Sequence, residues 1–209
     1  MKVVLFCHSL LSDWNHGNAH FLRGVCSELH ARGHDATAYE PENSWSYQNL
    51  LADGGERFLA EFKAAYPNLR SVRYGALDLE EVLSEVELAI VHEWNAPDLI
   101  GPIGAIRARS SAFRLFFHDS HHRAATQPET MAKLDLRGYA TEGLFRAGKD
   151  FLFAEDGKEM TARLDSLLTR PSLAKEVVAN GLQTIRNKHT CAQRVDQLLE
   201  ILDEINREE

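Results

Sequence analysis

The chain has 209 residues, of which 44% are hydrophobic and 26% are charged, and its formal net charge is −8. This length can bury a full hydrophobic core, and the composition is that of a globular protein. The negative charge and the lack of a lysine- or arginine-rich stripe argue against a nucleic-acid partner, because binding phosphates requires a basic patch.

The three cysteines, Cys7, Cys26 and Cys191, are far apart and form no CxxC motif. This pattern is typical of reduced thiols and not of a disulfide scaffold or a zinc finger. A strand-like run follows Met1 directly, where a secretion signal would have a basic segment and a separate apolar one. No apolar run reaches the length of a membrane span. We therefore expect a cytoplasmic protein without a membrane span.

The first strand and helix dominate the pattern. Residues 2–8 are an apolar, strand-like run, residues 9–18 a polar loop, and residues 19–33 an apolar-periodic helix that ends at Gly33. This order is typical of the first βα unit of a doubly wound sheet, in which ligands bind beyond the carboxyl ends of the strands.

Strands and helices then alternate along the chain. The pattern predicts further strands at 35–40, 69–74, 88–92, 113–118 and 151–154, and helices at 46–65, 79–86, 98–109, 127–135, 157–169, 172–188 and 190–206. Gly54 and Gly55 interrupt the helix at 46–65, and Asp78 is an acceptable N-cap for the helix at 79–86. Such alternation indicates an α/β fold with a mainly parallel sheet and right-handed crossovers.

Histidines are concentrated at the carboxyl ends of the expected strands. Of ten histidines, seven lie there or in the loops and helix start just beyond: His8, His16, His20, His92, His118, His121 and His122. Neighbouring parallel strands end at the same edge of a sheet, so these side chains are expected to converge on one cleft.

Three interpretations of this cluster stay open. Imidazoles with Asp13, Glu93 and Asp119 have the donor types of a metal site, although no HxH or HExxH spacing fixes a geometry. One histidine can instead act as a general base, since imidazole titrates near neutral pH. The third interpretation is that these histidines are only hydrogen-bonded loop residues.

Two further features belong to the same edge. The helix that follows Gly17 has free N–H groups that can accept a phosphate or carboxylate, although the loop is neither a GxGxxG motif nor a P-loop. Trp14, Trp45 and Trp94 can stack on a sugar or base, or can simply be packed against neighbours.

Several of these motifs carry a family resemblance. They are FCHS at 6–9, WNHGN at 14–18, RG at 23–24, RGHD at 32–35, HEWN at 92–95 and FHDSHHR at 117–123. Together they resemble the amino-terminal domain of GT-B glycosyltransferases, particularly the spore-maturation-type branch. The tail resembles the end of such an enzyme, with GLF at 143–145, GKD at 148–150, AED at 154–156, PSL at 171–173 and HT at 189–190.

The resemblance implies a domain organisation. A GT-B enzyme has two Rossmann-like domains with the active site between them, and the second domain holds most of the donor. Counterparts of the donor-binding strands are missing around residue 140. The chain therefore resembles an acceptor-side domain, 1–140, joined to a closing segment, 141–209, whose last strand and helices pack back on that domain. The expected sheet is then a single Rossmann-like one in strand order 3-2-1-4-5-6.

The resemblance also implies roles for individual residues. Intact relatives transfer a sugar from a nucleotide-sugar donor to an acceptor hydroxyl, without a metal or other cofactor. The catalytic residues are expected to be His118, Asp119 and His122. The expected contacts to the donor phosphates are His16, Gly17 and Asn18, and the other expected substrate contacts are His8, Trp14, His92, Glu93 and Asn95.

Two alternatives from other functional classes remain open. The chain can be a non-catalytic binding domain that has lost its donor half and forms a homodimer through the face that it exposes. It can also be a small metal-dependent hydrolase that uses the histidine cluster. In the glycosyltransferase interpretation, the expected small-molecule partner is a sugar nucleotide or an acceptor.

Overall fold

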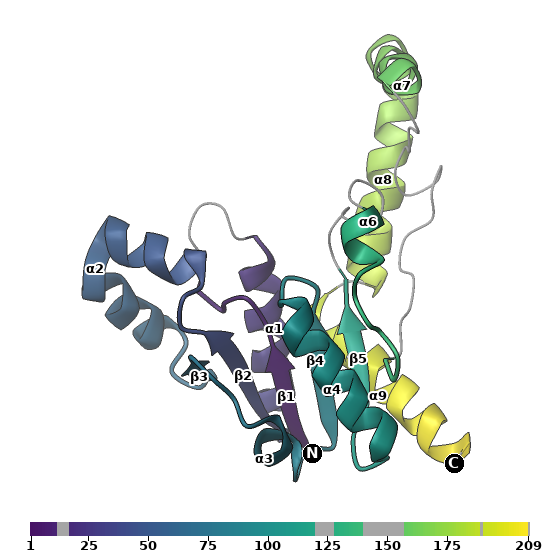
Figure 1. Cartoon of the computed structure of the whole chain (residues 1–209). Coiled ribbons are helices and arrows are strands. Elements are labelled where there is room, and N and C mark those ends of the chain that lie inside the picture. Colours follow the sequence, from purple (N-terminus) through teal and green to yellow (C-terminus); the bar gives the residue numbers. More distant parts are fainter. Residues whose placement is uncertain (12–16, 120–127, 140–156, 189, 209) are drawn as a thin grey trace. The chain divides into compact units, whose positions relative to one another are not determined.

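The structure is a computed structural model of the whole chain, and it describes residues 1–11, 17–119, 128–139, 157–188 and 190–208 (Figure 1). The chain divides into two compact units, Met1–Thr141 and Glu142–Glu209. The strand expected at 151–154 lies outside the described residues.

The first unit contains a five-stranded parallel sheet. Its strands are β1 (Lys2–Phe6), β2 (Asp35–Pro41), β3 (Arg70–Tyr74), β4 (Leu88–His92) and β5 (Arg114–His118). Their order across the sheet is β3-β2-β1-β4-β5. This order confirms the predicted doubly wound, Rossmann-like α/β fold for the described strands.

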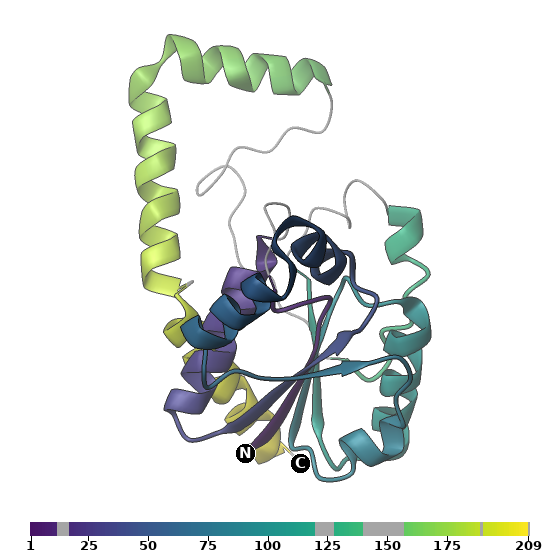
Figure 2. The same ribbon diagram turned by 90° about the vertical axis from the view of Figure 1, so that its left-hand side faces the viewer.

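Helices cover both faces of this sheet. They are α1 (Asn18–Ala31), α2 (Trp45–Ala65), α3 (Leu79–Leu83) and α4 (Pro97–Arg109), and the short α6 (Pro128–Met131) follows the sheet in the chain. Figure 2 shows α1 and α2 on one face and α3 and α4 on the other. The central strands are therefore buried on both faces, which is why they read as continuous apolar runs.

Successive residues of β1 belong to the cores on opposite faces of the sheet. Val4 and Phe6 belong to a cluster on the α4 side with Ile100, Ile103 and Leu115. Val3 and Leu5 point to the opposite face and are also fully buried. Burying a side chain of this size contributes about 1.5–3 kcal/mol. This two-sided core fixes the position of β1 and hence of the loop that follows it.

Local signals in the sequence explain several element ends. Gly33, at φ 80°, ends α1 in a Schellman motif, in which the His34 N–H donates to Leu29 O at 3.0 Å. Gly55 breaks α2 with φ 59° and ψ −155°. Asp78 caps α3 by accepting a hydrogen bond from the Glu81 N–H at 3.1 Å. All three ends agree with the sequence-based expectation.

Two helices are shorter than expected. The helix predicted for 79–86 ends at Leu83, and the one predicted for 127–135 covers only Pro128–Met131. After Met131 the chain forms tight turns, and the Asp135 carboxylate accepts a hydrogen bond from the Arg137 N–H at 3.2 Å. This local bond competes with helix formation, as is typical of aspartate.

The described residues of the second unit form α7 (Gly157–Thr169), α8 (Pro171–Lys188) and α9 (Cys191–Glu208), close to the predicted ranges. A capping box begins α9, because Thr190 Oγ1 accepts from the Gln193 N–H at 3.3 Å and Gln193 Oε1 accepts from the Thr190 N–H at 3.1 Å. No helix in the described ranges is long and apolar enough to cross a membrane.

Candidate functional site

The carboxyl ends of β1, β4 and β5 lie side by side in the sheet, and polar residues follow each of them. The Asn95 side-chain amide joins two of these ends, because Nδ2 donates to Phe6 O at 2.7 Å and to His92 O at 2.8 Å. Asn95 is buried. The loop after β4 is therefore anchored to the last residue of β1.

His92 and His118 form a pair at the ends of β4 and β5. They are register partners, and their ring centroids lie 4.9 Å apart with the rings nearly perpendicular. His92 Nδ1 accepts a hydrogen bond from the Trp94 N–H at 3.2 Å, so the ring proton of a neutral His92 lies on Nε2. His92 is only 1% exposed, whereas His118 is half-buried. Of the two, His118 is the imidazole that solvent reaches.

The neighbours of this pair differ in exposure. Glu93 is fully buried, and its N–H donates to His118 O at 3.0 Å, which extends the β4–β5 pairing by one residue. Trp94 and Asp119 are exposed. Glu93, like His92 and Asn95, is therefore part of the buried layer of the edge, while Trp94 and Asp119 are exposed to solvent.

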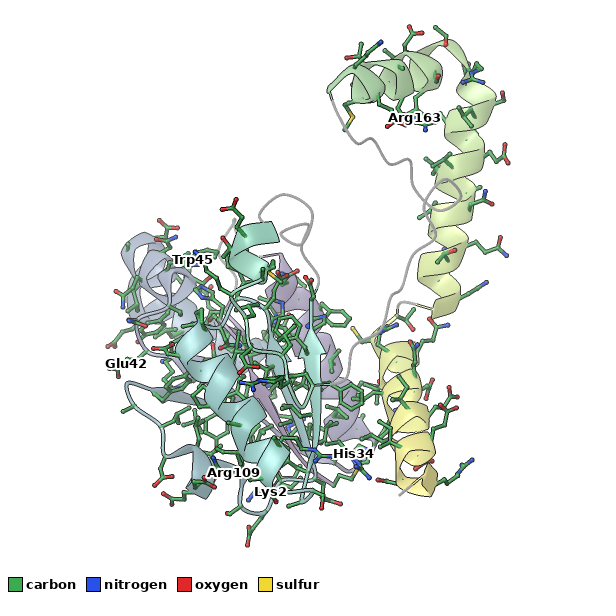
Figure 3. All side chains as sticks on the ribbon, turned by 45° about the vertical axis from the view of Figure 1, so that its right-hand side comes forward. Lys2, His34, Glu42, Trp45, Arg109 and Arg163 are labelled. Carbon is green, nitrogen blue, oxygen red and sulfur yellow. The ribbon has the colours of Figure 1, made fainter. Side chains whose placement is uncertain are left out.

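His8 lies against the start of α2. Its ring centroid is 4.5 Å from that of Trp45, and its Nε2 accepts a long, 3.5 Å hydrogen bond from the Ser46 N–H. His8 is buried, while Trp45 is 36% exposed. Figure 3 places Trp45 at the end of the first unit opposite to Lys2 and Arg109, which is the carboxyl end of the strands.

The amino terminus of α1 completes the described edge. Gly17 occupies the N-cap position with helical backbone angles and no side-chain cap, and Asn18 is the first helical residue. The first turn carries no acidic side chain. The partial positive charge of this helix end favours an anion over a cation.

Other predicted site residues lie outside the described residues: Asp13, Trp14, His16, His121 and His122. Their roles stay predictions. Within the residues that the structure does describe, no group of three or more His, Cys, Asp or Glu side chains is placed to hold a metal ion.

Sequence reasoning missed two buried charged residues next to this edge, Arg23 on α1 and Glu40 on β2. Glu40 lies on the same face of β2 as the buried Ala36 and Ala38, so it occupies a core position of the strand. A signal was present in the sequence, since a charged residue in phase with apolar positions is an anomaly.

A separate hollow of about 820 Å³ lies between α3 and the second half of α4. Its lining includes Leu77, Leu79, Pro102, Ile106 and Arg109. Arg109 lies at the end of the first unit opposite to Trp45 (Figure 3). This hollow is therefore not part of the histidine-bearing edge.

Comparison with known proteins gives one match. Residues 136–200 match the family model described as glycosyl transferase-like. No curated protein and no solved structure matches the chain. The matched segment covers less than half of the chain, namely the end of the first unit and most of the second. This match, together with the Rossmann-like sheet, supports a glycosyltransferase-like protein.

Proposed function

We propose that the chain is a glycosyltransferase-like protein of GT-B type, with the first unit as its acceptor-side domain. The observation that carries the proposal is the His92–His118 pair at the carboxyl edge of a Rossmann-like sheet, in a chain that also has a glycosyl transferase-like segment. The activity is transfer of a sugar from a nucleotide donor to an acceptor hydroxyl.

In this proposal His118 is the general base. Its ring takes the proton of the acceptor hydroxyl, the hydroxyl oxygen forms a bond to the anomeric carbon, and the bond from that carbon to the nucleoside diphosphate breaks. The buried His92 ring holds His118 in place, since the two rings are in contact. Asp119, the exposed next residue, and His122 assist the base.

Donor and acceptor contacts come from neighbouring parts of the edge. The amino terminus of α1, at Gly17 and Asn18, and His16 receive the donor diphosphate. Trp14 and His8 contact the substrates from the β1 side. On the β4 side, the loop formed by His92, Glu93 and Asn95 contacts them through its exposed Trp94. The proposal requires no metal ion.

We also propose that the second unit is a closing segment that packs back on the first. Its support is the amphipathic sequence of α9, in which Val195, Leu198, Leu199 and Leu202 recur at helical spacing. A chain that ends at residue 141 should then unfold at a lower temperature than the full chain and bind a hydrophobic dye. Equal stability of the two chains would contradict this packing.

A ligand screen followed by an activity assay tests the sugar-transfer proposal. A nucleotide sugar that binds the native state raises its unfolding temperature, and turnover is then measured with that donor. We expect His118→Ala to abolish turnover with an unchanged circular dichroism spectrum. His34→Ala is the matched control, because His34 is a half-buried histidine, like His118, but lies at the other end of the sheet. Full turnover in His118→Ala would refute the assignment of the base.

A second candidate function is a non-catalytic, self-associating domain. The observation that favours it is an exposed apolar stripe on α7, where Met160, Leu164 and Leu168 are 49%, 52% and 82% exposed. Analytical ultracentrifugation of the wild type and of Leu168→Glu tests it, with Ala162→Glu as control. A dimer that only Leu168→Glu dissociates, in a protein that no nucleotide sugar stabilises, would favour this function over sugar transfer.

A further inference from the structure

Two residues of opposite charge are buried inside the first unit. Glu40 is 2% exposed and Arg23 is 4% exposed. In the described part of the chain, neither side chain forms an ion pair. A buried charge costs several kcal/mol unless hydrogen bonds or an opposite charge compensate it, so these two residues need a physical explanation.

Their hydrogen bonds meet at one residue, Leu10. Glu40 Oε2 accepts from the Leu10 N–H at 2.7 Å, and Arg23 Nη1 donates to Leu10 O at 2.6 Å. The carboxylate and the guanidinium thus hold the two polar groups of a single residue. Hydrogen bonds to ionised groups are short and strong, and the opposite charges offset each other across Leu10.

Glu40 and Arg23 each form further contacts besides those to Leu10. Glu40 Oε2 also accepts from the Ser9 hydroxyl at 2.8 Å, and Glu40 Oε1 accepts from the Ser71 hydroxyl of β3. Arg23 Nη2 lies 2.8 Å from His20 Nδ1, and the guanidinium stacks 5.0 Å from the Tyr66 ring centroid. The arrangement therefore ties β2, β3, α1 and α2 to the residue at the start of one loop.

We propose that Glu40 and Arg23 are positioning residues for the sugar-transfer site, which they serve by clamping the loop between β1 and α1 at Leu10. This inference rests on the proposed function, because the loop begins at His8 and ends at the amino terminus of α1. With Leu10 held on both sides, His8 stays against Trp45, and the helix end keeps its position relative to the strand.

The clamp also argues against a dinucleotide as the ligand of this edge. In doubly wound folds that bind dinucleotides, an acidic residue at the end of the second strand binds the ribose hydroxyl. Glu40 lies near the end of β2, but Ser9, Leu10 and Ser71 occupy both of its oxygens. Its carboxylate is therefore engaged within the protein and is not offered to a ribose.

The charge of Glu40 also acts on two neighbouring thiols. Burial first, and then the charge of Glu40, raise the pKa of the Cys26 thiol from 9.0 to about 12. The same two causes raise the pKa of Cys7. Both cysteines flank the clamp, Cys7 in the chain before Ser9 and Cys26 on α1 with Arg23.

Amide hydrogen exchange tests the clamp without any ligand. In Glu40→Gln we expect the Leu10 amide to lose about 10-fold or more of its protection, while amides of β4 keep theirs, because only a local opening is made easier. Glu42→Gln is the matched control, since Glu42 is exposed and lies just beyond Glu40. Unchanged protection at Leu10, or a parallel loss throughout the sheet, would overturn the clamp.

Compensating variants keep the test valid if a single change prevents folding. Arg23→Met leaves the carboxylate buried alone, so the double variant Glu40→Gln/Arg23→Met should be destabilised less than the sum of the two single variants. Arg23→Lys keeps the positive charge, so it should be less destabilised than Arg23→Met. Strict additivity of the two changes would refute coupling through Leu10.

The positioning role is tested with inorganic pyrophosphate as the probe of the helix end. Calorimetric titration at a temperature where all variants are folded should show at least about 10-fold weaker binding in Glu40→Gln and Arg23→Lys than in the wild type and Glu42→Gln. Equal affinity in all four proteins would leave the clamp as a structural feature only and overturn the positioning role.

The outcomes separate this inference from the proposed function. Loss of turnover in His118→Ala with normal pyrophosphate binding in the clamp variants supports sugar transfer and refutes the positioning role. A wild type that binds neither pyrophosphate nor a nucleotide sugar refutes the proposed function and the positioning role together, whereas exchange at Leu10 alone decides the clamp. Binding of NAD that Glu40→Gln abolishes would refute the exclusion of dinucleotides.

Discussion

Substitution of Gly104 by alanine should destabilise the protein, whereas the same substitution at Gly101 should stabilise it. Both glycines lie in α4, where alanine is favoured over glycine by about 1 kcal/mol. A Cβ on Gly104 would lie 2.6 Å from Arg137 O and 3.0 Å from a ring carbon of Tyr139. Among the described residues, a Cβ on Gly101 would meet the Asp135 Cβ alone, at an ordinary 3.8 Å.

The contacts around Gly104 give the size of the expected difference in the free energy of unfolding between the two variants. Relieving the contact at Gly104 means moving the backbone of Arg137, and overpacking of this kind costs about 1–3 kcal/mol. The movement also disturbs the 2.8 Å hydrogen bond from the Tyr139 hydroxyl to Ile100 O, which contributes about 1 kcal/mol. After the helix gain is subtracted, Gly104→Ala should lose about 1–3 kcal/mol, and the two variants should differ by about 2–4 kcal/mol.

Urea and thermal unfolding followed by circular dichroism measure this difference. For a chain of this size, 2–4 kcal/mol corresponds to roughly 4–16 °C between the two unfolding midpoints. A Gly104→Ala variant as stable as Gly101→Ala would refute the close crossing of α4 and the Arg137–Tyr139 segment. That crossing matters because the segment is part of the glycosyl transferase-like residues, which begin at 136.

The cysteines supply the remaining predictions. Cys7 and Cys26 are buried and have raised pKa values, so in the native protein a disulfide reagent such as dithiobisnitrobenzoate should react rapidly only at the half-buried Cys191. Rapid labelling of the Cys191→Ser variant would contradict the burial of the other two. Stability should also fall at alkaline pH, because the unfolded chain releases the Cys26 proton above 9.0 while the folded chain holds it to about 12. The stabilisation from the protonated Cys26 is therefore complete below pH 9.0 and is lost as the pH rises toward 12. In urea unfolding across this range, the free energy of unfolding should fall less steeply for Cys26→Ala than for the wild type.

Most of the fold could be predicted from the sequence because its determinants are local. Apolar runs such as residues 88–92 mark strands that are buried on both faces, and Gly33 and Asp78 mark helix ends through their own backbone chemistry. The length of α6 could not be predicted, since it depends on how the chain turns after Met131 to reach α4. The spacing of apolar residues contains no information about how the chain turns back toward α4.

The candidate site could be predicted only in part, for a related reason. Adjacent parallel strands end together, so the sequence predicts that His92 and His118 are neighbours. Exposure depends on packing from distant segments, and the sequence did not reveal that His92 and Glu93 are buried. The contact of His8 with Trp45 joins two segments that are distant in the sequence, which is a tertiary property.

The hydrogen bonds of Asn95 have a mechanical consequence. Because one amide group holds the last carbonyl of β1 and the last carbonyl of β4, the loops that follow these strands are joined at their roots. A displacement of the loop that carries the exposed Trp94 would therefore be transmitted through Asn95 to the peptide that precedes Cys7. Under the proposed function, the contacts of these two loops with acceptor and donor would then change together and not one after the other.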